Sequence, residues 1–135
     1  MVILSVDYGD VRTGIAVCDK MEILASPVTV ITQSYEPKLI AEIEKIISQY
    51  KPELIVVGLP KNMDGTIGER ADKCKSFADT LMEKTGIKTV MVDERLTTVS
   101  AHRALNVTNV RGDKRKGIVD AVSAVMILES YLASK

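Results

Sequence analysis

The sequence is poor in aromatic, histidine and cysteine residues. Its 135 residues include no tryptophan, one phenylalanine and four tyrosines, so the core must be packed mostly with aliphatic side chains. The only histidine, His102, and the two cysteines, Cys18 and Cys74, are not at the spacing of zinc ligands. A zinc site is therefore not expected, and we interpret both cysteines as reduced thiols in the core.

Long apolar runs and an excess of charge of one sign are also missing. With 18 basic and 18 acidic residues the formal net charge is zero, so any basic surface must be local. The first apolar run is interrupted at Asp7 and follows no basic region, which excludes a signal peptide or a membrane span there. We therefore expect a cytoplasmic protein with one domain, residues 1–135, and a real core.

The first predicted strand ends on an acid. Val2–Val6 is a short apolar run typical of a buried strand, and Asp7 is expected at its end because a carboxylate is costly inside a core. A polar link flanked by Gly9 and Gly14 follows, and Thr13–Cys18 is again β-branched and apolar. This pattern predicts a hairpin with Asp7 at its lip.

The rest of the chain predicts strands and helices in turn. A third strand over Glu22–Ile31 is broken by Pro27, which favours the margin of a sheet. Another short strand, Thr89–Val92, also runs into acids. The other expected elements are a helix from Ser34 to Tyr50, a buried strand at Leu54–Leu59, a polar loop at Lys61–Gly68, a helix from Glu69 to just before Gly86, a short helix from Thr97 or Thr98 to about Leu105, a basic loop at Asn106–Lys116, and an apolar helix at Ile118–Leu132 that is buried on most sides. This order indicates an α/β fold with a mixed sheet flanked by helices.

Three acids stand in apolar surroundings, namely Asp7, Glu94 and Asp120. If the first strand and Thr89–Val92 are parallel neighbours, Asp7 and Glu94 leave the sheet at the same end, and Asp120 completes the cluster from the last helix. Converging carboxylates repel one another unless divalent cations neutralise them. Oxygen ligands without histidine or cysteine indicate Mg²⁺ or Mn²⁺, and such a site supports phosphoryl transfer. Taken singly, each acid has a plainer explanation as a turn former or a helix-start acid.

Four segments in order resemble the YqgF/RuvX family, whose members are provisionally named pre-16S rRNA nucleases or Holliday junction resolvase-like proteins. The segments are Asp7–Ala16, Val57–Thr66, Asp93–Thr98, and Lys116–Ala121 followed by Ala124–Leu128. The resemblance implies an RNase H-like fold with five strands, the second antiparallel, and a nuclease that hydrolyses phosphodiester bonds. It also implies that Asp7, Glu94 and Asp120 occupy the family's three acidic positions, which are proposed to bind metal and to cut nucleic acid.

Basic residues near these acids are the candidates for holding nucleic acid. Arg12 and Arg95 each adjoin one of the acids and can meet a backbone phosphate bidentately. Lys61 belongs to a loop that opens on the ligand side of the predicted sheet. The basic run before Asp120 is the best candidate for a mobile clamp, and it contains Arg111, Lys114, Arg115 and Lys116.

The leading hypothesis is a metal-dependent nuclease that matures the 5′ end of pre-16S rRNA, with an rRNA precursor as partner. A Holliday junction resolvase is an alternative, although resolvases of this fold carry a fourth acid where this chain has Ser123. A catalytically silent RNA-binding ribosome-assembly factor would keep the fold, but all three acids are present. Actin-like ATPases and sugar kinases begin with a similar hairpin, yet they need a second copy of it and two domains. The oligomeric state, monomer or weak dimer, stays open.

Overall fold

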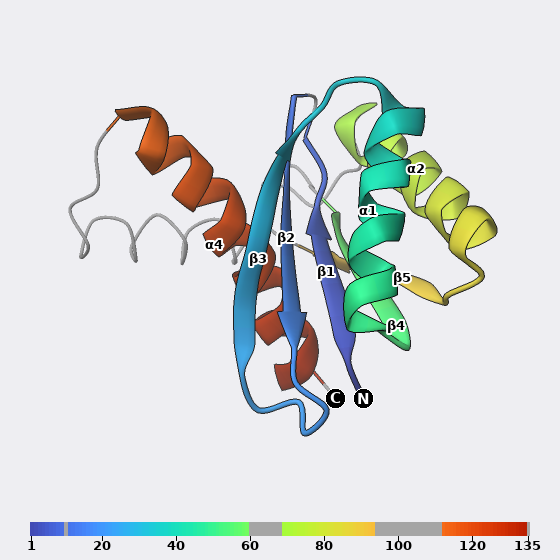
Figure 1. Ribbon diagram of the computed structural model, residues 1–135, viewed down its shortest axis with the longest axis vertical. Helices are drawn as coiled ribbons and strands as arrows, with labels where there is room; N and C mark the ends of the chain where they lie inside the picture. Colours follow the sequence, from blue (N-terminus) through green and yellow to red (C-terminus); the bar gives the residue numbers. More distant parts are fainter. Residues whose placement is uncertain (10, 60–68, 94–111, 135) are drawn as a thin grey trace.

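One mixed sheet of five strands organises the computed structural model, which describes residues 1–9, 11–59, 69–93 and 112–134 (Figure 1). The sheet has the order β3-β2-β1-β4-β5. Strand β2 is antiparallel to β1 and β3, whereas β4 is parallel to β1 and to β5. The predicted mixed sheet with an antiparallel second strand is therefore confirmed. The strands are β1 Ile3–Asp7, β2 Arg12–Cys18, β3 Ala25–Thr32, β4 Leu54–Leu59 and β5 Thr89–Asp93.

Strand β3 lies at an edge of the sheet, as its proline predicted. Ile15 of β2 pairs with Thr29, but the next residue, Ala16, pairs with Pro27. Val28 is therefore the extra residue of a β-bulge, the kind of irregularity in which a proline is tolerated.

The third strand begins later than expected, at Ala25 instead of Glu22. The Asp19 carboxylate accepts hydrogen bonds from the backbone N–H groups of Ile23 (2.8 Å) and Leu24 (3.2 Å), which folds the preceding residues into a turn. The terminal amino group adds an ion pair with Glu22 at 3.0 Å. This turn exposes large apolar side chains, with Ile23 78% exposed.

Two helices cover one face of the sheet, which we call the helix-pair face (Figure 1). Helix α1, Glu36–Tyr50, has Pro37 in its first turn and ends where Lys51 adopts a left-handed conformation with φ 52°. Helix α2, Glu69–Thr85, ends at Gly86, whose φ of 71° favours glycine. Both ends of α2 and the carboxyl end of α1 agree with the prediction, whereas α1 begins at Glu36, two residues after the expected Ser34.

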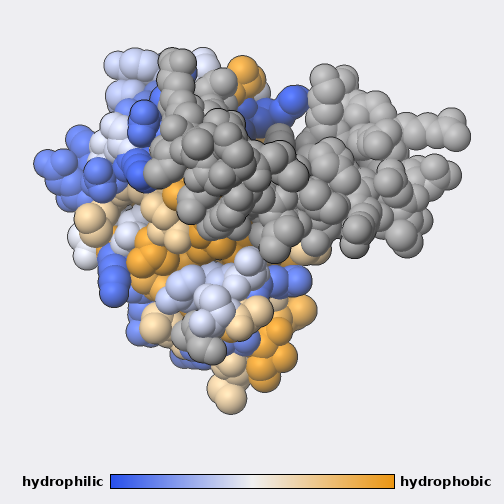
Figure 2. All heavy atoms as spheres, turned by 180° about the vertical axis from the view of Figure 1, so that it is seen from behind, coloured by the Kyte–Doolittle hydropathy of each residue, from blue (hydrophilic) through white to orange (hydrophobic). Residues whose placement is uncertain are grey.

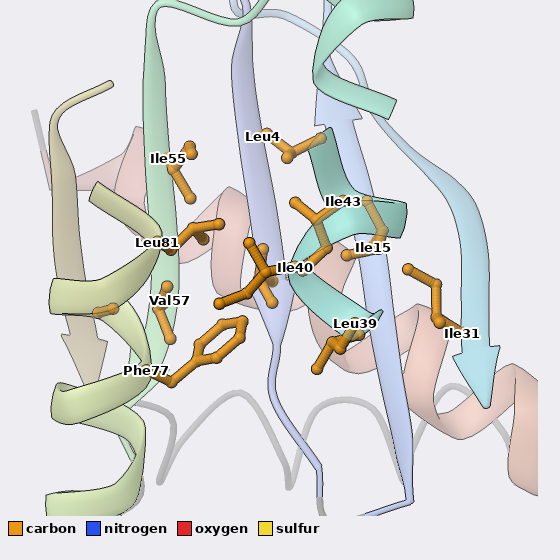
Figure 3. Close-up of a cluster of buried hydrophobic side chains, with 12 residues drawn as sticks. Leu4, Ile15, Ile31, Leu39, Ile40, Ile43, Ile55, Val57, Phe77 and Leu81 are labelled. Atoms are coloured by element: carbon orange, nitrogen blue, oxygen red, sulfur yellow. The ribbon is translucent and has the colours of Figure 1, made fainter. Parts of the chain in front are cut away.

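The main core lies between the sheet and this helix pair. Figure 3 shows Leu39, Ile40 and Ile43 of α1 and Phe77 and Leu81 of α2 pointing toward the strands. The predicted apolar face of α2 is buried throughout, and it comprises Ala71, Cys74, Phe77, Ala78 and Leu81. Cys18 and Cys74 are buried thiols that form no disulfide, as the sequence predicted.

Helix α4, Gly112–Ala133, packs on the opposite face of the sheet, which we call the α4 face. Two predictions about this region are wrong. Residues 112–116 are helical, although a loop was expected up to Lys116. The helix was also expected to be buried on most sides, but in its described part only Ala124, Ile127 and Leu128 are buried, because it packs on the sheet along a single stripe. The short helix expected from Thr97 or Thr98 lies outside the described residues.

The α4 face is the side seen in Figure 2, where apolar residues gather in the middle of the visible surface and hydrophilic ones lie around them. Within the described part of the chain, no helix is long and apolar enough to cross a membrane.

Candidate functional site

The described part of the candidate site is built on Asp7, the last residue of β1. Strand β1 is buried from Ile3 to Val6, and Asp7 is the first of its residues to be only half-buried. Up to Val6 the strand has apolar partners on both neighbouring strands. Beyond Val6 it leaves the core. The predicted position of Asp7 at the lip of the sheet is confirmed.

Alternate residues of β1 lie against successive turns of α4. Ile3 belongs to the same buried cluster as Ile127 and Leu128. One level on, the Ser5 hydroxyl donates a buried hydrogen bond of 2.7 Å to the backbone carbonyl of Ala124. Strand and helix therefore run in opposite directions, as Figure 1 also shows.

Asp7 and Asp120 lie on the same side of this hydrogen bond. Asp7 comes two strand residues, about 6.6 Å, after Ser5, and Asp120 comes four helix residues, about 6 Å, before Ala124. The Asp120 side chain is outside what the structure describes.

The residue paired with Asp7 has no side chain. It is Gly14 of β2. Alternate residues of β2 point to opposite faces, and Cys18 belongs to the cluster on the α4 face, so Arg12 points to that face as well. Arg12 is half-buried and lies diagonally across from Asp7 at the same lip.

The strand that precedes Glu94 ends at the same edge as β1, but the two are not neighbours. Strand β4 lies between β1 and β5, so the two strands are parallel but the condition that they are neighbours is not met. Val6 pairs with Val57, and the next residue of β4, Gly58, pairs with Val92. The two strands therefore end at nearly the same level, about 10 Å apart across two strand spacings.

Several predicted site residues lie outside the described part of the structure. These are Glu94, Lys61, Arg95 and Arg111. The backbones of Lys114, Arg115 and Lys116 lie in the first turns of α4, without a description of their side chains. Among the side chains that the structure does describe, no group of three histidine, cysteine, aspartate or glutamate residues could hold a metal ion. The three-acid cluster therefore stays a prediction.

The sequence reading missed the residues that support Asp7. Ser5 anchors α4 on β1, and the one signal was a lone hydroxyl in an otherwise apolar strand. The ring of Tyr8 stacks on that of Phe77, with centroids 4.2 Å apart and planes within 6° of parallel. No sequence period links Tyr8 to Phe77, so this contact could not have been predicted.

Two shifted pKa values occur at the other end of β2. Burial raises the pKa of the Cys18 thiol. The N–H groups of Ile23 and Leu24 hold the pKa of Asp19 below its usual value, because they stabilise the carboxylate. Cys18 and Asp19 lie at the end of β2 that is farther from the candidate site.

The sheet order and the helices on both faces define an RNase H-like fold, the fold of the RuvC-type resolvases. A structure described as "T. thermophilus RuvC in complex with Holliday junction substrate" matches with a TM-score of 0.64 at 14% identity, covering 99% of this chain and 96% of that one. This likeness concerns the fold alone.

The chain belongs to the RuvX family. The family model, described as "Holliday junction resolvase", matches residues 1–134. A relative from Agathobacter rectalis is 44% identical over 135 residues, covering 98% of this chain and 94% of its own length. One from Lachnospira eligens is 45% identical over 138 residues, covering 100% and 99%. Both carry the provisional name pre-16S rRNA nuclease. The family and its members are thus named for nucleases, which are hydrolases of phosphodiester bonds.

Proposed function

We propose that this protein is a divalent-metal-dependent nuclease that matures the 5′ end of pre-16S rRNA in the cytoplasm. Residues 1–135 would act as one nuclease domain, with Asp7, Glu94 and Asp120 as its metal-binding and catalytic acids. The observation that supports the proposal is the buried hydrogen bond from the Ser5 hydroxyl to the Ala124 carbonyl, which joins β1, two residues before Asp7, to α4, four residues after Asp120.

The carboxylate oxygens of Asp7 are suitable ligands for a hard cation. Asp7 offers carboxylate oxygens at the end of β1, and the residue paired with it, Gly14, has no side chain. Carboxylate oxygens are the donors preferred by Mg²⁺ and Mn²⁺. When bound there, such an ion supplies an activated water and stabilises the leaving oxygen of a phosphodiester.

Basic residues around this lip would hold the phosphate backbone. Arg12 lies on the α4 face at the same lip as Asp7, so a phosphate near the acid is within reach of a guanidinium group. Lys114, Arg115 and Lys116 lie one to two turns before Asp120 along α4. We extend the assignment to Lys61, Arg95 and Arg111 on the sequence pattern alone.

An rRNA precursor is favoured over a four-way DNA junction by one residue of α4. The family resemblance implies a fourth acid in resolvases of this fold, three residues after the third, and this chain has the half-buried Ser123 there. A hydroxyl binds a divalent ion more weakly than a carboxylate does, so the substrate phosphate would have to complete the site. The near full-length relatives named pre-16S rRNA nuclease agree with this choice.

The test is a competition assay. Purified protein with Mn²⁺ receives equal amounts of a pre-16S rRNA 5′ end and a four-way DNA junction. We expect trimming of the RNA at the higher rate. Asp7→Asn should abolish it, while Asp72→Asn, which changes an exposed acid on α2, should not.

Two other outcomes of this assay would contradict the proposal. Faster symmetric nicking of the junction would identify a resolvase. Equal RNA binding by the wild type and Asp7→Asn without any cleavage would identify a non-catalytic RNA-binding assembly factor.

A further inference from the structure

The carboxyl end of β1 has a support on the face away from its acid. Tyr8 follows Asp7 and stacks on Phe77 of α2, at 4.2 Å between ring centroids and 6° between planes. Phe77 is fully buried in the main core, so the surface that receives the Tyr8 ring is itself fixed. Figure 3 shows Phe77 reaching from α2 toward the sheet beside Val57.

The stack of Tyr8 on Phe77 lies where the strand pairing of β1 ends. On the β4 side the parallel pairing ends with Val6 and Val57, and on the β2 side the last pair is Asp7 with Gly14. Just beyond, a side chain at Gly9 would collide with the backbone carbonyl of Arg12, so the turn is tight. The Gly9 N–H donates to the Thr13 hydroxyl, but at 3.4 Å this bond is long. The ring stack is thus a contact that supports the strand end where the strand pairing has ended.

Asp7 and Tyr8 point to opposite faces of the sheet. Leu4, Val6 and Tyr8 belong to or pack against the core on the helix-pair face, whereas Ser5 contacts α4. Because successive residues of a strand alternate, Asp7 points to the α4 face. Rotation of the strand end about its own axis would therefore move both side chains together, and fixing the ring of Tyr8 fixes the direction of the Asp7 carboxylate.

We propose that Tyr8 is a positioning residue for Asp7, and that its stack on Phe77 holds the carboxylate in the direction needed to bind a divalent ion. This inference rests on the proposed function, since it assigns a metal-binding role to Asp7. Tyr8 contacts neither metal nor substrate in this scheme. Its effect is transmitted through the backbone that the two residues share.

Two substitutions separate stacking from simple burial. Tyr8→Phe keeps the flat ring and loses only the hydroxyl. Tyr8→Leu keeps an apolar side chain against the same core but loses the parallel ring contact. Ile43→Val serves as the matched control, because it removes one methylene from the same cluster, on α1, and lowers stability without touching the lip.

The first readout is Mn²⁺ affinity of the protein without nucleic acid, followed by electron paramagnetic resonance of free Mn²⁺. Tyr8→Leu should weaken binding about two- to tenfold, the factor that corresponds to one aromatic pair. Tyr8→Phe should bind like the wild type. Ile43→Val should also bind like the wild type at a temperature where it is fully folded.

The second readout is whether the substitution changes kcat or KM. At saturating Mn²⁺, Tyr8→Leu should lower kcat about tenfold or more with KM for the RNA unchanged, since a misdirected ligand affects the reacting centre and not the grip on the backbone. A structural role alone would lower the fraction folded and leave both constants of the folded protein unchanged.

The outcomes distinguish this inference from the proposed function. If Tyr8→Leu matches Ile43→Val in Mn²⁺ affinity and in kcat while Asp7→Asn loses both, the positioning role is overturned and the nuclease site stands. If Asp7→Asn keeps wild-type Mn²⁺ affinity and cleavage, the proposed site itself is wrong, and the positioning role fails with it.

Discussion

The Ser5 hydroxyl donates a hydrogen bond of 2.7 Å to the backbone carbonyl of Ala124, a residue 119 positions later in the chain. Both groups are buried, and the bond joins the middle of β1 to the middle of α4. It fixes how far the helix can slide along the strand. The level of Asp120 relative to Asp7 depends on this register.

Ser5→Ala should therefore destabilise the protein by about 1 kcal/mol, because a buried hydrogen bond is lost. The midpoint of thermal unfolding should fall by about 4 °C. Urea denaturation followed by circular dichroism measures the change. The matched control is Ser48→Ala, which removes an exposed hydroxyl that donates to the Glu44 carbonyl at 3.1 Å and should leave stability nearly unchanged. Equal stability of the two variants would show that the bond does not hold α4 in place.

Asp7→Asn should separate stability from activity. If the three acids converge, removing one charge reduces their repulsion, so the metal-free protein should be as stable as the wild type or more stable, by at most about 1 kcal/mol. Cleavage should fall by on the order of 10²-fold or more, because charge stabilisation at the reacting phosphate is lost. Thermal unfolding in EDTA and cleavage with Mn²⁺ measure the two effects. A clear loss of stability in EDTA would argue against converging carboxylates.

Replacing Lys114, Arg115 and Lys116 with alanine should weaken the binding of RNA and DNA alike. Each lost phosphate contact should flatten the dependence of log affinity on log salt by roughly 0.7–0.9. These residues lie in the first turns of α4, where positive charge opposes the helix dipole, and alanine favours helices, so the triple variant should keep its helix. Filter binding across a salt series, with circular dichroism as the folding control, tests this. A slope identical to that of the wild type would remove these residues from the interface.

The turn before β3 should make stability depend on pH through Asp19. Its pKa is held below its usual value of about 3.8 by the N–H groups of Ile23 and Leu24, so its charged form is favoured by folding. The stabilisation is present above about pH 4 and is lost as the pH falls through the lowered pKa.

Asp19→Asn keeps an acceptor oxygen but no charge, so the wild type should unfold at a higher temperature than this variant at pH 7, and the difference should vanish near pH 2. Unfolding temperatures from pH 2 to 7 measure it. Asp72→Asn, which changes an exposed acid on α2, provides the baseline. A difference between wild type and Asp19→Asn that does not change with pH would refute the assignment.

Local patterns in the sequence predicted the elements and the end of β1. Apolar runs, helical spacing and turn residues are local signals, and they predicted the strands, both ends of α2, the carboxyl end of α1, and Asp7 at a strand end. Local signals gave wrong predictions at the start of β3 and at the start of α4. The Asp19 carboxylate turned residues predicted as strand into a loop, and the basic residues before Ile118, read as a loop, are helical.

Which elements lie side by side was settled by packing in the folded protein. The insertion of β4 between β1 and β5, the register of α4 on β1, and the stack of Tyr8 on Phe77 each join residues far apart in the chain. Side-chain periods repeat within one element and carry no information about which partner an element will meet. Pairing and packing are settled when the whole core is buried at once, and this is why the sequence could propose Asp7 as a ligand but could not find the residues that hold it in place.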